Sequence, residues 1–437
     1  MSHAYLDAID ALSLFPEQGV VTKVAPGRIE ATGPSMPLGA LCEIASDDGV
    51  RLAEVAAIDT DRVVVVPIEP VGALRPGARV RKRNQHDHVG VGDRFAGRAV
   101  DALGRPFDGL GLLIPNSVAP RIGAMAAPLD RIEPDRVSET GVRAIDALLT
   151  LGIGQRIGIF AASGVGKTSL IEQLARQMQS DRVILCLVGE RGREVEALWR
   201  QLSSRHDADR FTVVAATSDE SASLRARATD QALGLAEYWR DAGEHVLLII
   251  DSVTRLAMAL REIGLAAGEP PTVRAYTPNV FAALPRLVER CGATRKGSIT
   301  AVMTVLSETD DVDDPIVEVM KALLDGHIVL SRTLAERGHF PAIDLSRSIS
   351  RLASKLVSPD HARAAQRASE LLSVYEQSRL LIESGLYRAG ADAQIDRAVA
   401  ARPGLMALLR QPMDERASLD DAVRALAAAL PNRGSGA

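Results

Sequence analysis

The hydrophobic and polar positions of the chain change their pattern twice along its length. Residues 19–83 contain short β-branched runs cut by Gly and Pro, and the first pair of runs has the form of a β-hairpin turning at Pro26-Gly27. Several short strands at this spacing indicate a small barrel or sandwich. We find no candidate chemistry in this region.

From about residue 150 to 350, fully apolar runs alternate with helical patterns. The runs are RVILCLVG, FTVVAAT, HVLLIID and ITAVMTVL, and the longest helical pattern is ASLRARATDQALGLAEYWRD. Such alternation is typical of an α/β domain with a mostly parallel sheet. Residues 264–285 contain four prolines, so we expect one long ordered loop there. From about Lys355 onward the pattern is helical throughout.

Composition narrows the class of protein. Apolar residues make up 46% of the 437 residues and aromatic residues only 3%, so the core is built from aliphatic side chains. A net charge of -5 gives no general attraction to nucleic acid or to an anionic membrane. Cys42, Cys186 and Cys291 fit no metal-binding spacing and are expected to be reduced core residues. No apolar run reaches the ~20 residues of a membrane helix. We therefore expect a cytoplasmic protein without a nucleic-acid partner.

The most informative stretch is residues 154–169, GQRIGIFAASGVGKTS. A short apolar strand breaks into a glycine loop, and a helix starts at Gly-Lys-Thr, as in the phosphate cradle of P-loop NTPases. Lys167 would reach the β- and γ-phosphates of ATP, and the Thr168 hydroxyl would hold Mg²⁺. The strict motif has Gly where this chain has Ala161, so a plain strand–helix loop remains the alternative. The expected nucleotide-binding residues here are Ala162, Ser163, Gly164, Val165, Gly166, Lys167, Thr168 and Ser169.

Acidic and basic residues follow other strands of the expected sheet. Glu190, at the tip of a neighbouring strand, is the candidate that polarises the attacking water, although it could instead be a glutamate that favours a helix dipole. Asp251 ends an aliphatic strand in the Walker B arrangement, where its carboxylate holds Mg²⁺ or its waters. An arginine must also stabilise the transition state. The candidates are Arg191, Arg255 and Arg351, and the residues alone do not decide which acts within its own subunit.

Two further features look like sites but have simpler explanations. Arg143 and Asp146 are expected to brace the P-loop strand rather than to act in chemistry. Four aspartates between residues 310 and 314 suggest a metal site, but the segment lacks the Gly and terminal Glu of a calcium loop. A solvated acidic loop is the favoured interpretation, and its role stays open.

Several motifs together carry a family resemblance. GIFAASGVGKTSL, VGERGREV, VLLIIDSVTRLAMALRE, YTPNVFAALPRLVERCG, DGHIVLSRTLAERGHFPAID and SISR resemble the rotary-type hexameric ATPases. That family includes the head subunits of ATP synthase and the export ATPases of flagella and type III injectisomes. GRAVDALGRPFDG, TGVRAIDALLTLG and the SGVGKT loop are most similar to the flagellar export ATPases, in which Ala is common at the position of Ala161.

The resemblance implies four parts and a set of roles. The parts are an amphipathic arm (1–18), a β-barrel domain (19–90), a RecA-like P-loop ATPase core (91–354) and a helical C-terminal domain (355–437). The residues of the arm alone fit a helix packed on its own barrel equally well. Lys167 and Thr168 would hold phosphate and Mg²⁺, and Glu190 would be the catalytic carboxylate. By the remaining motifs, Arg191 would contact phosphate and Arg255 would lie near the γ-phosphate. Glu194 and Asp251 would hold the water shell of the metal. Arg351 would be the arginine finger that reaches into the neighbouring subunit, and Phe340 would stack on adenine.

The resemblance also implies partners and a location. The chain would form a homohexamer, bind a stator-like regulatory dimer through its N-terminal arm, and meet the export gate, chaperones and unfolded cargo through its C-terminal domain. It would work at the cytoplasmic face of the inner membrane, as a peripheral part of the export apparatus.

Other functions stay open at this point. An injectisome ATPase is the nearest alternative. A catalytic subunit of ATP synthase is disfavoured by SVTRLAMALREIG and by the N-terminal arm, and a non-catalytic ring subunit is opposed by Glu190. A transcription-termination helicase shares the core, but the acidic balance and the lack of interleaved basic and aromatic residues oppose RNA binding.

Overall fold

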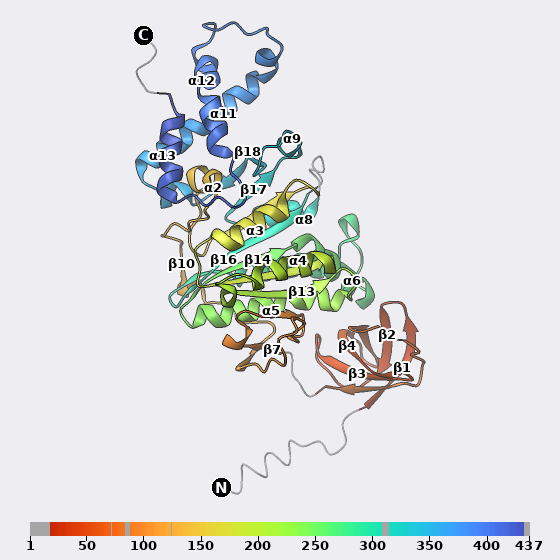
Figure 1. The fold of residues 1–437 in the computed structure, drawn as a ribbon. Coiled ribbons are helices and arrows are strands. Elements are labelled where there is room, and N and C mark those ends of the chain that lie inside the picture. The colour runs from red at the N-terminus through yellow and green to blue at the C-terminus, as the bar shows by residue number, and fades with distance from the viewer. Residues whose placement is uncertain (1–17, 71, 84–87, 124, 308–313, 432–437) are drawn as a thin grey trace.

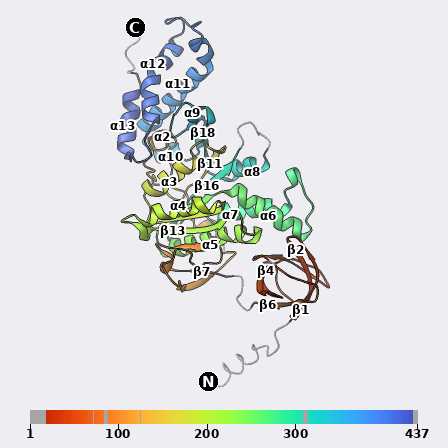
Figure 2. The same cartoon turned by 45° about the vertical axis from the view of Figure 1, so that its right-hand side comes forward.

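The computed structural model describes residues 18–70, 72–83, 88–123, 125–307 and 314–431. Within these residues a β-barrel, a sheet layered by helices and a group of helices follow one another along the long axis of the molecule (Figure 1). The second view shows the barrel and the C-terminal helices at opposite ends of the sheet domain (Figure 2). This architecture confirms the predicted fold class. The N-terminal arm and the acidic loop fall almost wholly outside the described residues.

Six strands of the described chain close the barrel in the order β1-β2-β5-β4-β3-β6. β1 and β2 form the expected hairpin, whose turn is Pro26-Gly27. Along each strand, buried residues such as Val21, Ile29 and Ile44 alternate with exposed ones and fill the interior. The strands are β1 (Gln18–Ala25), β2 (Arg28–Thr32), β3 (Leu41–Ser46), β4 (Gly49–Ile58), β5 (Val63–Pro67) and β6 (Arg79–Lys82).

The central sheet has the main strand order β18-β17-β11-β16-β14-β12-β13-β8 among the described residues. All neighbours along this path are parallel except β17 and β18. The strands are β8 (Ala99–Asp101), β11 (Arg156–Ala161), β12 (Arg182–Glu190), β13 (Phe211–Thr217), β14 (His245–Asp251), β16 (Ser298–Leu306), β17 (Gly326–Leu330) and β18 (Ile343–Ser350). β15 (Gly292–Thr294) pairs with β16, and β10 (Arg131–Ile132) pairs with β15. β7 (His88–Val91) and β9 (Ser117–Pro120) form a separate pair.

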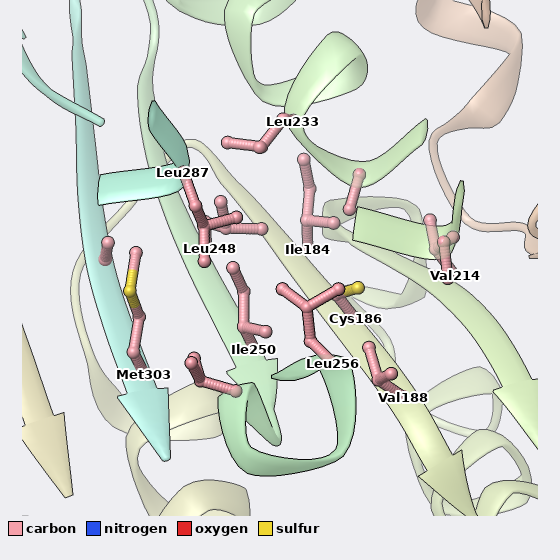
Figure 3. Packing of buried hydrophobic residues seen from close by; sticks show 14 of the residues in the cluster. Ile184, Cys186, Val188, Val214, Leu233, Leu248, Ile250, Leu256, Leu287 and Met303 are labelled. Atoms are coloured by element: carbon pink, nitrogen blue, oxygen red, sulfur yellow. The ribbon is translucent and has the colours of Figure 1, made fainter. Parts of the chain in front are cut away.

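Helices cover both faces of the sheet, which explains why its strands are apolar on both sides. α2, α3 and α4 pack on one face, and α5, α6, α7 and α8 pack on the other. Figure 3 shows Ile184, Cys186 and Val188 of β12 packed toward the side of α5 and α6. The three cysteines are buried and free, as expected. The helices are α2 (Arg143–Leu148), α3 (Lys167–Gln177), α4 (Gly192–Ser203), α5 (Ala222–Asp241), α6 (Val253–Ala267), α7 (Pro278–Glu289), α8 (Pro315–Leu323) and α9 (Arg332–Glu336).

The prediction of one loop over residues 264–285 is wrong. α6 continues to Ala267 and α7 begins at Pro278, so only residues 268–277 connect them. Pro278 is tolerated because the first turn of a helix has no acceptor for a backbone N–H, and Pro285 lies inside α7, which packs its buried face on the core. Packing of the amphipathic face therefore outweighs the missing hydrogen bond.

The C-terminal helices pack on each other and on α2. They are α10 (Ala353–Leu356), α11 (Pro359–Glu383), α12 (Ala393–Leu409) and α13 (Leu419–Ala429). Arg143 holds this group to the core: its guanidinium donates to the carbonyl of Leu408 and pairs with Glu415. Asp146 accepts from the backbone N–H groups of Thr140 and Gly141. Both residues are structural, but neither braces the P-loop strand as expected.

Candidate active site

The glycine loop lies between the end of β11 and the start of α3, at the edge of the sheet where parallel strands end. Gly164 and Gly166 have φ values of 78° and 91°, which residues with a Cβ rarely adopt. A Cβ on Gly166 would also lie 3.3 Å from the Phe340 ring. The backbone N–H groups at the start of α3 therefore remain open to an anion.

Two carboxylates converge on the ammonium group of Lys167. Asp251, the last residue of β14, is paired with it directly, and the Lys167 Nζ lies 3.8 Å from the Glu190 Oε1. The three side chains are only 12%, 7% and 11% exposed for Lys167, Asp251 and Glu190. A largely desolvated cluster of this kind enhances electrostatic interactions with any phosphate that enters.

Glu190 reaches this cluster from an unexpected place. The sequence put it on a strand neighbouring the P-loop strand, but β16 and β14 lie between β11 and β12. Burial raises the pKa of the Glu190 carboxyl, and the Asp251 charge raises this pKa further, while Lys167 and Arg255 act in the opposite direction. A carboxylate with a raised pKa in such a cluster is suited to accept a proton or to orient water.

The other predicted basic residues divide between near and far positions. The Arg255 Nε lies 3.4 Å from the Glu190 Oε1, and its guanidinium donates to the Gly189 carbonyl. Arg191 instead is 65% exposed, and its recorded ion pair is with Glu194 at 3.7 Å. The structure thus joins Arg255 to the Lys167 cluster, while Arg191 points to solvent beside it.

Phe340 is brought next to the P-loop from a distant part of the chain. It precedes β18, is 46% exposed, and lines a cavity of about 300 Å³ together with Gly166, Ser169 and Gln173. Gln411 and Met413 from the C-terminal segment complete the lining. An open aromatic face beside a phosphate cradle has the geometry needed to stack on a base.

Arg351 lies at the opposite edge of the sheet. Ser350 pairs with Gly326 at the start of β17, and the Arg351 N–H donates to the carbonyl of Asp325. Asp325 in turn pairs with Arg156, the first residue of β11. Because the P-loop follows the other end of β11, Arg351 is separated from it by the length of that strand, roughly 17 Å. It cannot complete the site of its own chain.

Comparisons with known proteins agree with this geometry. The sequence model of the ATP synthase alpha/beta family, nucleotide-binding domain, matches residues 141–350, and the T3SS EscN ATPase C-terminal domain matches residues 357–428. A flagellum-specific ATP synthase of Bacillus subtilis is 41% identical, over 99% of both chains. A type 3 secretion system ATPase of Xanthomonas euvesicatoria is 42% identical, over 93% of both chains. The assembled ATPase EscN of enteropathogenic E. coli superposes with a TM-score of 0.90 at 40% identity, over 94% of this chain and 99% of that one.

The chain belongs to the flagellar and type III secretion branch of the ATP synthase alpha/beta family. It is an ATPase. The family covers nearly the whole length of the chain, so the barrel and the C-terminal helices belong to it as much as the P-loop core does.

Sequence reasoning missed one residue that orders the ATPase cluster. Thr304 on β16 is buried, and its hydroxyl donates to the Asp251 Oδ1 at 2.6 Å. Thr304 reaches Asp251 because β16 and β14 are adjacent strands, and the bond fixes the orientation of the carboxylate that pairs with Lys167. The only signal in the sequence was that Thr304 is one of two threonines within the otherwise apolar run ITAVMTVL.

The site fits a magnesium nucleotide better than a metal bound by protein alone. Among the described residues no group of three or more His, Cys, Asp and Glu side chains is placed to hold a metal. Asp251 and Glu190 nevertheless face one shared space, and Mg²⁺ commonly binds through one or two carboxylates, waters and substrate phosphates.

Within the described part of the chain, no helix has the length and apolar character needed to cross a bilayer.

Proposed function

We propose that this ATPase powers protein export through the flagellar type III apparatus. It would act as a cytoplasmic homohexamer at the inner face of the membrane. The observation that carries the proposal is the Lys167 cluster beside the glycine loop, in a chain similar over 99% of its length to a flagellum-specific ATP synthase. The alternative is an injectisome, because the type 3 secretion system ATPases are similar to the same degree.

In the proposed mechanism Lys167 and the loop N–H groups neutralise the phosphates of ATP. Glu190 orients the attacking water, Arg255 fixes the Glu190 carboxylate, and Phe340 holds the adenine. The Thr168 hydroxyl would hold Mg²⁺, with Asp251 and Glu194 on its waters. When bound, Mg²⁺ would neutralise negative charge on the phosphates. Arg351 of an adjacent copy would complete the site in the transition state, a role that its position at the opposite edge of its own sheet supports.

The remaining parts would connect hydrolysis to export. We assign the N-terminal arm (1–18) to a stator-like regulatory dimer. The helical region 355–437 would meet the export gate, the chaperones and the unfolded cargo. The structure of the assembled relative EscN in complex with its central stalk EscO supports an assembly with a central partner for this chain.

A chromosomal Lys167→Ala allele tests this proposal. We expect a sharp fall in flagellar filament protein in the medium, with growth and ATP synthesis unchanged. Lys23→Ala, an exposed lysine of the barrel, is the matched control and should export normally. Normal filament export with loss of another secreted set would assign the enzyme to an injectisome. A respiration defect would contradict the export function.

A further inference from the structure

The cavity beside Phe340 extends along one face of α3, away from the glycine loop. Four residues of this segment line it, and their spacing places them on one face of the helix: Gly166, Ser169, Leu170 and Gln173. Its volume of about 300 Å³ lies at the lower end of the range of ligand sites. Because phosphates bind at the N-terminus of a helix, a base that stacks on Phe340 extends along this face toward Gln173.

Gln173 lies at the end of the cavity farther from the phosphates. It follows Gly166 by seven residues, which corresponds to roughly 10 Å along the helix axis. The residue is buried, with only 3% of its surface exposed. A buried amide beside a cavity must form its hydrogen bonds with neighbouring groups or with the molecule that fills the cavity.

The orientation of the Gln173 amide is set by a relay of hydrogen bonds from the C-terminal region. The Gln177 Nε2 donates to the backbone carbonyls of Met413 at 3.2 Å and Glu415 at 2.9 Å. The Gln177 Oε1 in turn accepts from the Gln173 Nε2 at 3.4 Å. Carbonyls only accept, so Gln177 cannot turn its amide round without losing both bonds. The Gln173 Oε1 is left as an acceptor to which no residue of the described chain donates.

The other amide of the cavity is already fully used. The Gln411 Nε2 donates to two backbone carbonyls, and its Oε1 accepts from the Arg143 N–H at 2.7 Å. Apart from Ser169, which lies toward the phosphate end, the remaining side chains that line the cavity are apolar. Gln173 is therefore the residue placed to read the far edge of a base.

We propose that Gln173 selects adenine, its Oε1 accepting a hydrogen bond from the 6-amino group of the base that stacks on Phe340. Guanine carries a carbonyl oxygen at that position, so two acceptors would face each other. A glutamine without the relay can turn its amide round and donate to guanine, but the bond to Gln177 opposes this. The proposal rests on the proposed placement of adenine against Phe340, and it names the residue that restricts this site to adenine nucleotides.

The unmodified enzyme provides the first test. Purine riboside triphosphate has a hydrogen atom in place of the 6-amino group, and GTP has a carbonyl oxygen there. We expect the KM for each of these nucleotides to exceed the KM for ATP by about tenfold or more, because a buried acceptor is left without its partner. The value of kcat should change little, since position 6 is remote from the transferred phosphate. Equal KM values for ATP and purine riboside triphosphate would overturn the proposal.

Gln173→Met removes the acceptor and keeps a side chain of similar length. We expect the KM for ATP to rise to that for purine riboside triphosphate, with kcat and the thermal midpoint unchanged. Gln366→Met is the matched control, because Gln366 is an exposed glutamine of α11 whose Nε2 also donates to a residue four positions on, Glu370. The control should retain the preference for ATP. The same preference in Gln173→Met would overturn the proposal.

Phe340→Ala separates the selection of adenine from the placement of the base. This variant should raise the KM for all three nucleotides alike, because stacking does not depend on the group at position 6. If it does so while Gln173→Met keeps the preference for ATP, the base lies on Phe340 but Gln173 does not select it. If neither variant changes any KM, the placement of adenine is wrong as well. Both results leave the export function standing, because Lys167→Ala tests that function in the cell.

Discussion

The two edges of the central sheet differ in how completely one chain satisfies them. At the carboxyl edge Lys167 is paired with Asp251, and Arg255 lies against Glu190, so opposite charges are paired within one chain. At the amino edge the described residues form no ion pair with Arg351, and the surface beside it exposes apolar side chains such as Ile132 and Ile349. The carboxyl edge therefore holds a nearly complete nucleotide site. The amino edge holds an exposed surface and the cation Arg351, but no nucleotide site of its own chain lies beside them. The asymmetry is what a head-to-tail ring requires.

The largest expected effect comes from removing the cation of the amino edge. Arg351→Ala should lower kcat for ATP by about 10³-fold or more, because an arginine finger is worth ~10³–10⁵ in phosphoryl transfer. The folded structure should be unchanged, since Arg351 is exposed and, among the residues that the structure describes, its side chain donates only to the carbonyl of Lys321. Arg332→Ala, an exposed arginine at the start of α9, is the control and should retain activity.

Mixing variants sharpens the same test. Lys167→Ala lacks the carboxyl-edge cation but keeps Arg351, and Arg351→Ala has the reverse composition. In mixed rings about a quarter of the contacts would join an intact P-loop to an intact Arg351. ATP hydrolysis should therefore reappear when two inactive preparations are combined. A mixture as inactive as its components would show that the edges do not meet.

Glu190→Gln should lower kcat by about 10²–10⁴-fold while ATP binding is retained. The glutamine amide keeps the shape of the side chain, but it carries no negative charge with which to accept a proton from the attacking water or to orient that water. Burial and Asp251 raise the pKa of Glu190. As the pH is lowered, ATP hydrolysis by the unmodified enzyme should therefore begin to decline at a pH above the ordinary pKa of a glutamate. The pH profile of kcat and the affinity for a fluorescent nucleotide measure both effects. Loss of binding instead would assign Glu190 a structural role.

The sequence predicted the carboxyl edge far better than the amino edge. Lys167 follows a strand whose apolar run is visible in the sequence, and Glu190 and Asp251 are the last residues of two more such strands. Parallel strands end at one edge of a sheet, so these side chains are expected to lie close together. The order of those strands could not be derived, so Glu190 was expected on a strand next to β11. The position of Arg351 depends on the pairing of β17 with β18 across the sheet. No local pattern near SISR encodes that pairing.

Side chains supplied by distant segments were similarly hidden. Thr304 orients Asp251 from 53 residues away, and Gln411 joins Phe340 at the P-loop from the C-terminal region. Residues 264–285 were predicted as a loop because proline was weighed by local preference alone. The buried face of α7 shows that packing decides there.

A smaller effect is expected from Phe340, which sharpens the picture of the carboxyl edge. Phe340→Ala should raise the KM for ATP by about fivefold to tenfold, because stacking of a base on an aromatic side chain contributes ~1–3 kcal/mol and this ring is half exposed. The value of kcat should change little, since the ring is remote from the transferred phosphate. Phe340→Tyr keeps the stacking face and should bind ATP normally. An unchanged KM for the alanine variant would remove Phe340 from the adenine site.

The smallest expected effect lies at the amino edge and concerns stability. His245 begins β14, and its Nε2 lies 2.9 Å from the hydroxyl of Thr300. That hydroxyl also accepts the Gly154 N–H, so Thr300 links the start of β14 to the segment before β11. The pKa of His245 is lowered to about 4, chiefly by burial; Asp181 opposes this shift, and Arg136 and Arg210 add to it.

The sign of the pH effect follows from which state binds the proton. Above the ordinary histidine pKa of ~6.5 the ring is neutral in both folded and unfolded chains, and the native contact is fully retained. Between that value and about 4 the unfolded chain takes up a proton that the folded chain refuses, so stability is lost as the pH falls. By pH 5 the loss from this one group is about 2 kcal/mol at most. The thermal midpoint of His245→Gln should therefore fall less between pH 7 and pH 5 than that of His206→Gln, which replaces an exposed histidine between α4 and β13. Equal falls would mean that the folded chain binds a proton at His245 as readily as the unfolded chain does.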